Sequence, residues 1–274
     1  MNKVSVICTI KNEGKSIAQF LDGLLAQSLV PDEIVLVDGG STDDTVASIE
    51  RYVAAGAPLT LLQEPGASRA RGRNLATCAA NYEIIACTDV GCIPRYDWLE
   101  RLTAPFEDPE IQAVGGFYRP QCTTRFEVCA GVATCPGREH IDTATWLPTT
   151  RSLAYTRAAW AKVGGFDDNL REAEDAPFVA SLRRADIQWA WALDAIVLWR
   201  PRSTLRAFLR QHTLYAYGDG ISATHVRPHI MLTTIYTTGM ILLAMAIRAR
   251  TPRRRLLLGG LLGVGSSADR KSVV

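Results

Sequence analysis

The sequence predicts an α/β fold with a single, mostly parallel, Rossmann-like sheet flanked by helices. Short apolar runs rich in Val and Ile, such as residues 34–37, are typical of parallel strands that are buried on both faces. Segments with apolar residues at helical spacing alternate with these runs in the order β-α-β-α-β. Polar, glycine-bearing turns follow the strands, which is where open α/β sheets bind their ligands.

The first half of the chain carries this alternation most clearly. Strands are predicted at residues 4–10, 34–37, 59–62 and 83–88. Helices are predicted at residues 16–26, 46–53 and 75–80, where apolar residues recur every three or four positions. Gly56 and Pro58 end the second of these helices.

The second half has weaker patterns. Strands are predicted at residues 113–118 and 151–155, with helices at 157–163 and 178–184. Residues 118–147 show little periodicity and are expected to form loops that shape a second binding site. Three tryptophans are expected to flank a hairpin or strand pair: Trp189, Trp191 and Trp199. Residues 204–218 alternate basic and aromatic residues, which favours an amphipathic helix at a membrane surface.

The composition excludes several classes of function. The net charge of the 274 residues is +2 and basic residues are interleaved with acids, so no nucleic-acid partner is expected. The seven cysteines form no CxxC pair, which favours reduced thiols in a cytosolic protein. The apolar run at residues 4–10 is too short for a signal peptide. A dehydrogenase is disfavoured because residues 9–14, after the first strand, lack GxGxxG.

Two aspartates, Asp38 and Asp89, stand at the ends of predicted strands. Asp38 leads into a Gly-Gly turn that lets the backbone approach a ligand, although a turn aspartate that bonds its own backbone is the alternative. Residues 66–74 carry three arginines, which suit either phosphate oxygens or a solvated basic face. Two carboxylates beside such a loop suit a nucleotide diphosphate with a divalent cation.

Six segments together resemble family 2 glycosyltransferases with the GT-A fold. They are residues 5–13, 37–45, 68–74, 87–94, 164–167 and 174–175, and they occur in the order and spacing of that family. The resemblance covers roughly residues 3–220. It implies an inverting enzyme that moves a sugar from a nucleotide-diphosphate donor to an acceptor hydroxyl.

The resemblance also implies roles for individual residues. The residues that it places at the nucleotide sugar are Thr9, Asn12, Glu13, Asp38, Gly39, Ser41, Arg69, Arg73, Asn74 and Asp89. Asp89 would also bind Mg²⁺ or Mn²⁺, but Gly91 stands where the family often has a second acid, so the donor phosphates would have to complete the metal site. Asp175, with Glu174, would be the general base that takes the acceptor's proton, although helix N-termini favour acids in any case.

The predicted domain organisation is a GT-A domain followed by a membrane-associated tail. Residues 1–115 would form the nucleotide-sugar half, 116–220 the acceptor half and 221–267 the membrane-associated hydrophobic segment, whereas 268–274 are expected to be non-native. Residues 230–247 carry no charge, but a span there would place the following arginines against the positive-inside rule. We therefore expect an interfacial or re-entrant helix, with a span that begins at Leu256; a helical hairpin is the alternative.

These predictions describe a glycosyltransferase on the cytoplasmic face of the cell membrane. Its expected partners are a nucleotide-diphosphate sugar and a lipid-linked or cell-envelope glycan as acceptor. The alternative is a degenerate GT-A domain that acts as a scaffold in a membrane assembly, for which Gly91 is the best support.

Overall fold

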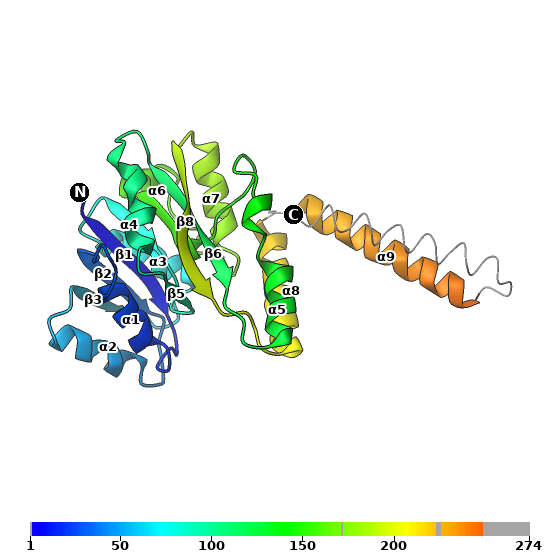
Figure 1. Cartoon of the computed structure of the whole chain (residues 1–274), viewed down its shortest axis with the longest axis horizontal. Coiled ribbons are helices and arrows are strands. Elements are labelled where there is room, and N and C mark those ends of the chain that lie inside the picture. Colours follow the sequence, from blue (N-terminus) through cyan, green and yellow to red (C-terminus); the bar gives the residue numbers. More distant parts are fainter. Residues whose placement is uncertain (1, 171, 223–225, 249–274) are drawn as a thin grey trace.

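The computed structural model describes residues 2–170, 172–222 and 226–248. One eight-stranded sheet, in the order β3-β2-β1-β4-β7-β6-β8-β5, forms its centre (Figure 1). The strands are β1 Val4–Ile10, β2 Glu33–Asp38, β3 Leu59–Gln63, β4 Ile84–Cys87, β5 Cys92–Pro94, β6 Ala113–Pro120, β7 Leu153–Thr156 and β8 Trp189–Trp199. Strands β1 to β4 run parallel, as do β6 and β8, whereas β7 is antiparallel to β4 and β6, and β5 to β8. The sheet is therefore mixed but mostly parallel.

Helices cover both faces of this sheet. The α-helices of the described chain are α1 Ile17–Leu25, α2 Thr45–Ala54, α3 Arg69–Ala79, α4 Trp98–Thr103, α5 Arg125–Thr134, α6 Arg157–Lys162, α7 Asp175–Arg184, α8 Leu205–Ser222 and α9 Val226–Arg248, of which α9 does not contact the sheet's buried clusters. Side chains of β1 alternate between two buried clusters: Val6 packs with α1, α2 and α4, and Ile7 packs with α3, α6 and α7. The predicted α/β fold, with a single, mostly parallel sheet flanked by helices, is confirmed.

Several elements differ from the prediction. The segment expected to form loops, residues 118–147, contains α5, which a capping box of Thr124 and Glu127 begins. The expected hairpin or strand pair between Trp189 and Trp199 is a single strand, whose register against β6 shifts between Gly115 and Phe117. Helix α3 begins six residues before the predicted start at 75, so its arginines lie on a helix.

The C-terminal part of the described chain is helical. Helix α9 contains the uncharged residues 230–247 and extends away from the sheet (Figure 1). Within residues 2–170, 172–222 and 226–248, no helix is both long and apolar enough to cross a membrane. The span expected from Leu256 and the non-native tail expected at 268–274 lie outside the described residues.

Candidate active site

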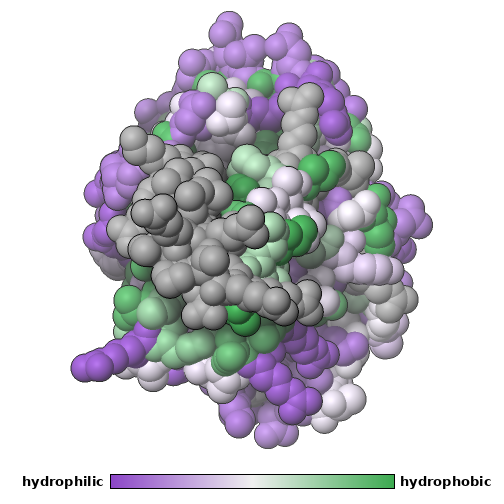
Figure 2. Space-filling view, turned by 90° about the vertical axis from the view of Figure 1, so that its right-hand side faces the viewer, coloured by the Kyte–Doolittle hydropathy of each residue, from purple (hydrophilic) through white to green (hydrophobic). Residues whose placement is uncertain are grey.

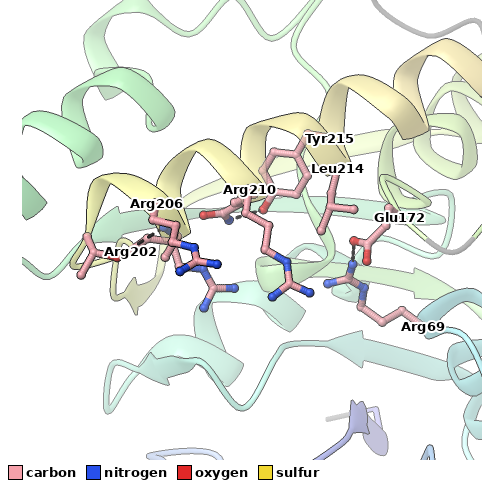
Figure 3. A pocket seen from close by; sticks show the side chains of 10 residues that line it. Arg69, Glu172, Arg202, Arg206, Arg210, Leu214 and Tyr215 are labelled. Atoms are coloured by element: carbon pink, nitrogen blue, oxygen red, sulfur yellow. Dashed lines mark hydrogen bonds and ion pairs between the residues drawn. The ribbon is translucent and has the colours of Figure 1, made fainter.

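Three adjoining hollows lie beside the carboxyl ends of β1, β2 and β4. The first, here called the strand-end cleft, has a volume of about 400 Å³ and is lined by residues that include Thr9, Glu13, Gly39, Ser68 and Gly72. The second, the acidic pocket, has about 200 Å³ and its lining includes Arg73, Asp89, Arg151, Glu174 and Asp175. The third, the arginine groove, has about 460 Å³ and its lining includes Glu172, Arg202, Arg206, Arg210 and Tyr215 (Figure 3). Because Arg69 lines all three, they form one continuous surface.

Asp38 is fully engaged by the turn that follows β2. Its buried carboxylate accepts hydrogen bonds from the backbone N–H of Gly40 at 3.0 Å and of Ser41 at 2.9 Å, and from the Ser41 hydroxyl at 2.5 Å. These are the contacts of a turn aspartate. Gly39 lines the strand-end cleft and Asp38 does not, so a contact between Asp38 and a nucleotide base stays a prediction.

Asn12 and Ser41 join the two strand-end loops. The Asn12 backbone, at φ +57°, donates to the Ser41 hydroxyl at 2.8 Å, and the Asn12 side chain accepts from the Thr42 backbone N–H at 2.8 Å. Glu13, through its backbone N–H, donates to the Thr45 hydroxyl at 2.8 Å and also lines the cleft. Of the residues predicted to bind the nucleotide sugar here, Thr9 and Glu13 therefore line the cleft, whereas Asn12 and Ser41 connect the two loops beside it by hydrogen bonds.

The N-terminus of α3 opens into the strand-end cleft. Ser68 caps the helix by accepting a hydrogen bond from the Arg71 backbone N–H at 3.2 Å. A Cβ atom added to Gly72 would lie 2.5 Å from Cγ2 of Thr9, so only glycine lets α3 approach β1 this closely. The free N–H groups and the positive dipole end of a helix favour an anion in the cleft.

Arg73 gathers three carboxylates that are distant in the sequence. Its buried guanidinium donates to Glu174, to Asp175 at 3.2 Å and to Asp89 at 3.0 Å. Its Cζ also lies 5.7 Å from the centre of the Phe166 ring. Bonds to acids engage both terminal nitrogens of the guanidinium, so a donor phosphate would have to compete with these acids for them. In this structure Arg73 positions the acids.

Arg69 and Asn74 differ in access to the hollows. Arg69 pairs with Glu172 and lies 3.4 Å from Glu174, but half of its side chain stays exposed to all three hollows. Asn74 lines none of them: its amide bonds the Phe166 backbone at 2.8 and 2.9 Å and the Asp168 carboxylate at 2.7 Å. Asn74 thus anchors the turn after α6, and its contact with the donor stays a prediction.

Asp175 is the member of the acidic pair that is more exposed and is held ionised. It opens α7 and accepts hydrogen bonds from the Thr150 hydroxyl at 2.9 Å and backbone N–H at 3.2 Å. Burial alone would raise the pKa of Asp175, but Arg73, Arg151 and the Thr150 bonds outweigh it and lower that pKa below its ordinary value. Burial raises the pKa of Glu174. The exposed fraction of the Glu174 side chain is 4%, whereas that of Asp175 is 24%. Asp175 therefore carries the negative charge that a proton acceptor needs.

The turn before Asp175 is held by α8. Ala173 has φ +56°, a conformation that residues other than glycine rarely adopt. A Cβ atom added to Gly218 of α8 would lie 2.5 Å from the Glu172 carbonyl oxygen and 2.7 Å from the Ala173 Cβ. The absence of a side chain at Gly218 thus allows α8 to press directly on this turn.

Asp89 is the residue that could hold a metal ion. One oxygen bonds Arg73 and 32% of the side chain is exposed in the acidic pocket. The described residues contain no group of three His, Cys, Asp or Glu side chains that could hold a metal ion. Mg²⁺ is commonly bound by one or two carboxylates together with substrate phosphates, and Asp89 fits that arrangement. A Cβ atom added at Gly91 would meet no atom within 4 Å, so the place of a second acid is open.

Arg151 is a site residue that the sequence analysis did not identify. Its guanidinium lies 5.1 Å from the Tyr118 ring and 5.0 Å from the Trp199 ring, and it donates to the Tyr215 hydroxyl at 3.3 Å. Among the described residues no carboxylate lies within ion-pair distance of it. Its three partners come from β6, β8 and α8, so no local pattern around residue 151 could have indicated this position.

Comparison with known families agrees with this geometry. The family model described as Glycosyl transferase family 2 matches residues 5–159. The match includes both strand-end loops, α3 and Asp89, and it ends before Glu174 and Asp175.

Curated relatives are similar at low identity. The chain is 24% identical over 229 residues to the pre-mycofactocin glycosyltransferase of Mycobacterium tuberculosis, which covers 77% of this chain and 46% of the relative. It is 25% identical over 210 residues to the O-antigen chain rhamnosyltransferase RfbN of Salmonella typhimurium, which covers 71% of this chain and 65% of the relative. The chain thus spans about half to two thirds of the length of these relatives.

A solved structure shares the fold. The mannosyltransferase PcManGT from Pyrobaculum calidifontis, in complex with GDP-Man and Mn²⁺, superposes with a TM-score of 0.68 at 23% identity. The similarity covers 97% of this chain and 80% of that one. The fold is therefore of the GT-A type, with a mixed, mostly parallel sheet flanked by helices.

Proposed function

The chain belongs to glycosyl transferase family 2, and on this premise we propose that it transfers a sugar from a nucleotide-diphosphate sugar to an acceptor hydroxyl, with inversion at the anomeric carbon. The observation that carries the proposal is the assembly of Asp89 and Asp175 around one buried arginine, Arg73, beside a cleft at the carboxyl ends of the strands.

The nucleotide diphosphate would occupy the strand-end cleft. The positive end of α3 and the accessible guanidinium of Arg69 face this cleft and suit phosphate oxygens. The sugar would extend toward Asp89 in the acidic pocket, which shares Arg69 with the cleft. A divalent cation held by Asp89 and the donor phosphates would neutralise charge on the leaving diphosphate.

Asp175 would act as the general base of a single displacement. The acceptor oxygen forms its bond to the anomeric carbon as the bond from that carbon to the diphosphate oxygen breaks, and the acceptor proton passes to Asp175. Thr150 and Arg73 fix the orientation of the carboxylate and keep it ionised. Arg69 and the N-terminus of α3 would stabilise the charge on the departing diphosphate.

We place this reaction at the cytoplasmic face of the cell membrane, with a lipid-linked or cell-envelope glycan as acceptor. Helices α5 and α8 lie side by side, with Phe126 and Phe208 in edge-to-face contact. Large apolar side chains on these two helices are exposed, namely Val128, Val132, Leu205, Leu209 and Ile221. Figure 2, in which α9 points toward the viewer, shows apolar side chains near the centre of this side of the molecule and hydrophilic ones above and below, and α9 exposes apolar residues of its own. Such a surface suits the headgroup region of a bilayer.

The proposal is tested with the full chain, a panel of nucleotide diphosphates and sugars, and Mn²⁺ or Mg²⁺. Asp175→Asn should lower the rate of transfer by about 10²- to 10⁴-fold and leave nucleotide affinity unchanged. Asp89→Asn should remove the effect of the metal on nucleotide affinity, measured by calorimetric titration. Absence of nucleotide binding by the well-folded wild type would contradict the proposal and favour the non-catalytic scaffold.

A further inference from the structure

We propose that the arginine groove binds a phosphoryl group of the acceptor, so that the acceptor is a phosphate- or diphosphate-bearing molecule. This inference rests on the proposed transferase function and names the class of its second substrate.

The positive charge of the arginines that line the groove is not neutralised by acids of the same lining. Arg202, Arg206 and Arg210 follow one another at four-residue spacing, and all three are exposed. Within the described part of the chain, none of them forms an ion pair or a side-chain hydrogen bond with another residue. The one acid in the lining, Glu172, is bonded to Arg69 (Figure 3). Arg206 and Arg210 are four residues apart on α8, where like charges repel one another, and a bound anion would relieve that repulsion.

Two further features of the groove point to a ligand. Helix α8 begins at Leu205, so its positive end lies among the arginines that line the groove. Gln211, 9% exposed, donates to the Tyr215 hydroxyl at 2.6 Å, but its buried Oε1 has no hydrogen-bond partner among the described residues. A buried polar atom without a partner is unusual in a native protein. Because Oε1 is an acceptor, a hydroxyl group of the ligand, beside its phosphate, would complete the site by donating to it.

The position of the groove assigns it to the acceptor. It shares Arg69 and Tyr215 with the acidic pocket, where Asp175 would meet the acceptor hydroxyl. The donor would fill the strand-end cleft and reach Asp89, so the remainder of the acceptor has to extend along α8. Figure 3 shows the guanidinium groups of Arg206 and Arg210 pointing from α8 into this space. Its volume of about 460 Å³ is within the usual range for a small-molecule site.

Two other phosphate-bearing groups, the donor diphosphate and a membrane headgroup, could bind arginines in the same way. The donor diphosphate is one, but the strand-end cleft already offers it the N-terminus of α3. A membrane headgroup is the other, because Leu205 and Leu209 are exposed on the same helix. The direct connection to Asp175 favours the acceptor over both.

The experiment compares the full-length wild type with the double variant Arg206→Gln/Arg210→Gln. The matched control is Arg51→Gln/Arg184→Gln, which removes two exposed arginines from α2 and α7. The probes are hexyl phosphate and inorganic pyrophosphate, titrated calorimetrically with and without saturating UDP or GDP; hexanol is the uncharged control. We expect hexyl phosphate to bind the wild type in the presence of nucleotide, and the double variant to bind it at least about tenfold more weakly. The control variant and all nucleotide affinities should stay unchanged.

Three outcomes would overturn the inference. Equal affinity of the double variant and the wild type for hexyl phosphate would show that the groove does not bind phosphate. A parallel loss of UDP or GDP affinity would assign the arginines to the donor. Arginine-dependent binding to vesicles that contain phosphatidylglycerol, without binding of hexyl phosphate, would assign them to membrane headgroups. Because the phosphate titration is also made without nucleotide, failure of every protein to bind nucleotide would refute the proposed function separately from the groove.

Discussion

Replacement of Arg73 by methionine should be among the most damaging single changes in this protein. The substitution keeps an unbranched side chain but removes the cation that Asp89, Asp175 and Glu174 share. The largest part of the cost should come from Glu174, which has almost no access to water. Removal of one partner from a buried ion pair costs about 3–5 kcal/mol, because a charge is left uncompensated. We expect a loss of this size in the free energy of unfolding near neutral pH.

This loss should depend on pH in a defined direction. In the wild type the folded pKa of Asp175 lies below its unfolded value, so Asp175 adds stability above a pH of about 4 and loses that contribution as the pH falls. Without Arg73, burial and mutual repulsion would raise the pKa of Asp175 above its unfolded value and would raise the pKa of Glu174, already elevated by burial, further. Both carboxyls would then destabilise the variant increasingly as the pH rises. The deficit should be smallest near a pH of about 4 and largest in mildly alkaline solution.

Urea unfolding at several pH values measures this effect, and Arg71→Met provides a matched control. Arg71 lies on the same helix and pairs with Asp168 at 3.3 Å, but both side chains are nearly half exposed. Such surface pairs contribute about 0–1 kcal/mol. A deficit of Arg73→Met that does not change with pH, or an equal deficit in Arg71→Met, would refute the view that Arg73 holds the acids together.

Three further changes have expected outcomes. Gly72→Ala should lower the free energy of unfolding by about 1–2 kcal/mol and weaken nucleotide binding, because its Cβ would meet Thr9, whereas Gly91→Ala should change little in the same urea titration. Thr150→Val should shift the acid limb of the pH–rate profile to higher pH, since Asp175 would lose a hydrogen bond that lowers its pKa; an unmoved limb would count against Asp175 as the base. Gly91→Asp should tighten Mn²⁺ binding in the presence of nucleotide diphosphate, and an unchanged affinity would argue against a metal site in the acidic pocket.

The sequence predicted β1 to β4 within one residue at each end, because they are short, largely apolar runs, whereas the three-residue β5 and the six-residue α4 were not predicted. Helix α5 was missed because it buries little and exposes Val128 and Val132. The T-x-x-E pattern at its start was the signal that could have revealed it. Strand β8 was divided in error because Asp194 interrupts its apolar pattern; Asp194 is exposed in the middle of the strand, whereas Trp199 is buried and Trp189 and Trp191 are partly buried.

Prediction of the site was uneven for a related reason. Strand ends bring Asp38 and Asp89 to one edge of any parallel sheet, so their neighbourhood follows from topology. The pairing of Arg73 with Glu174 joins residues 101 positions apart, through a turn whose position no local pattern determines. Arg151 depends on three elements from different parts of the chain. Positions that act through such long-range contacts require the folded structure.

The close contact between Gly218 and the turn at Glu172 and Ala173 has a consequence for engineering. Exchanging α8 alone between relatives, in order to change the acceptor, would place a foreign helix against a turn that it does not match, two residues from Asp175. A graft that carries residues 172–222 as one piece keeps that fit. A shortened chain for crystallisation should likewise end after Ser222, where α8 is complete.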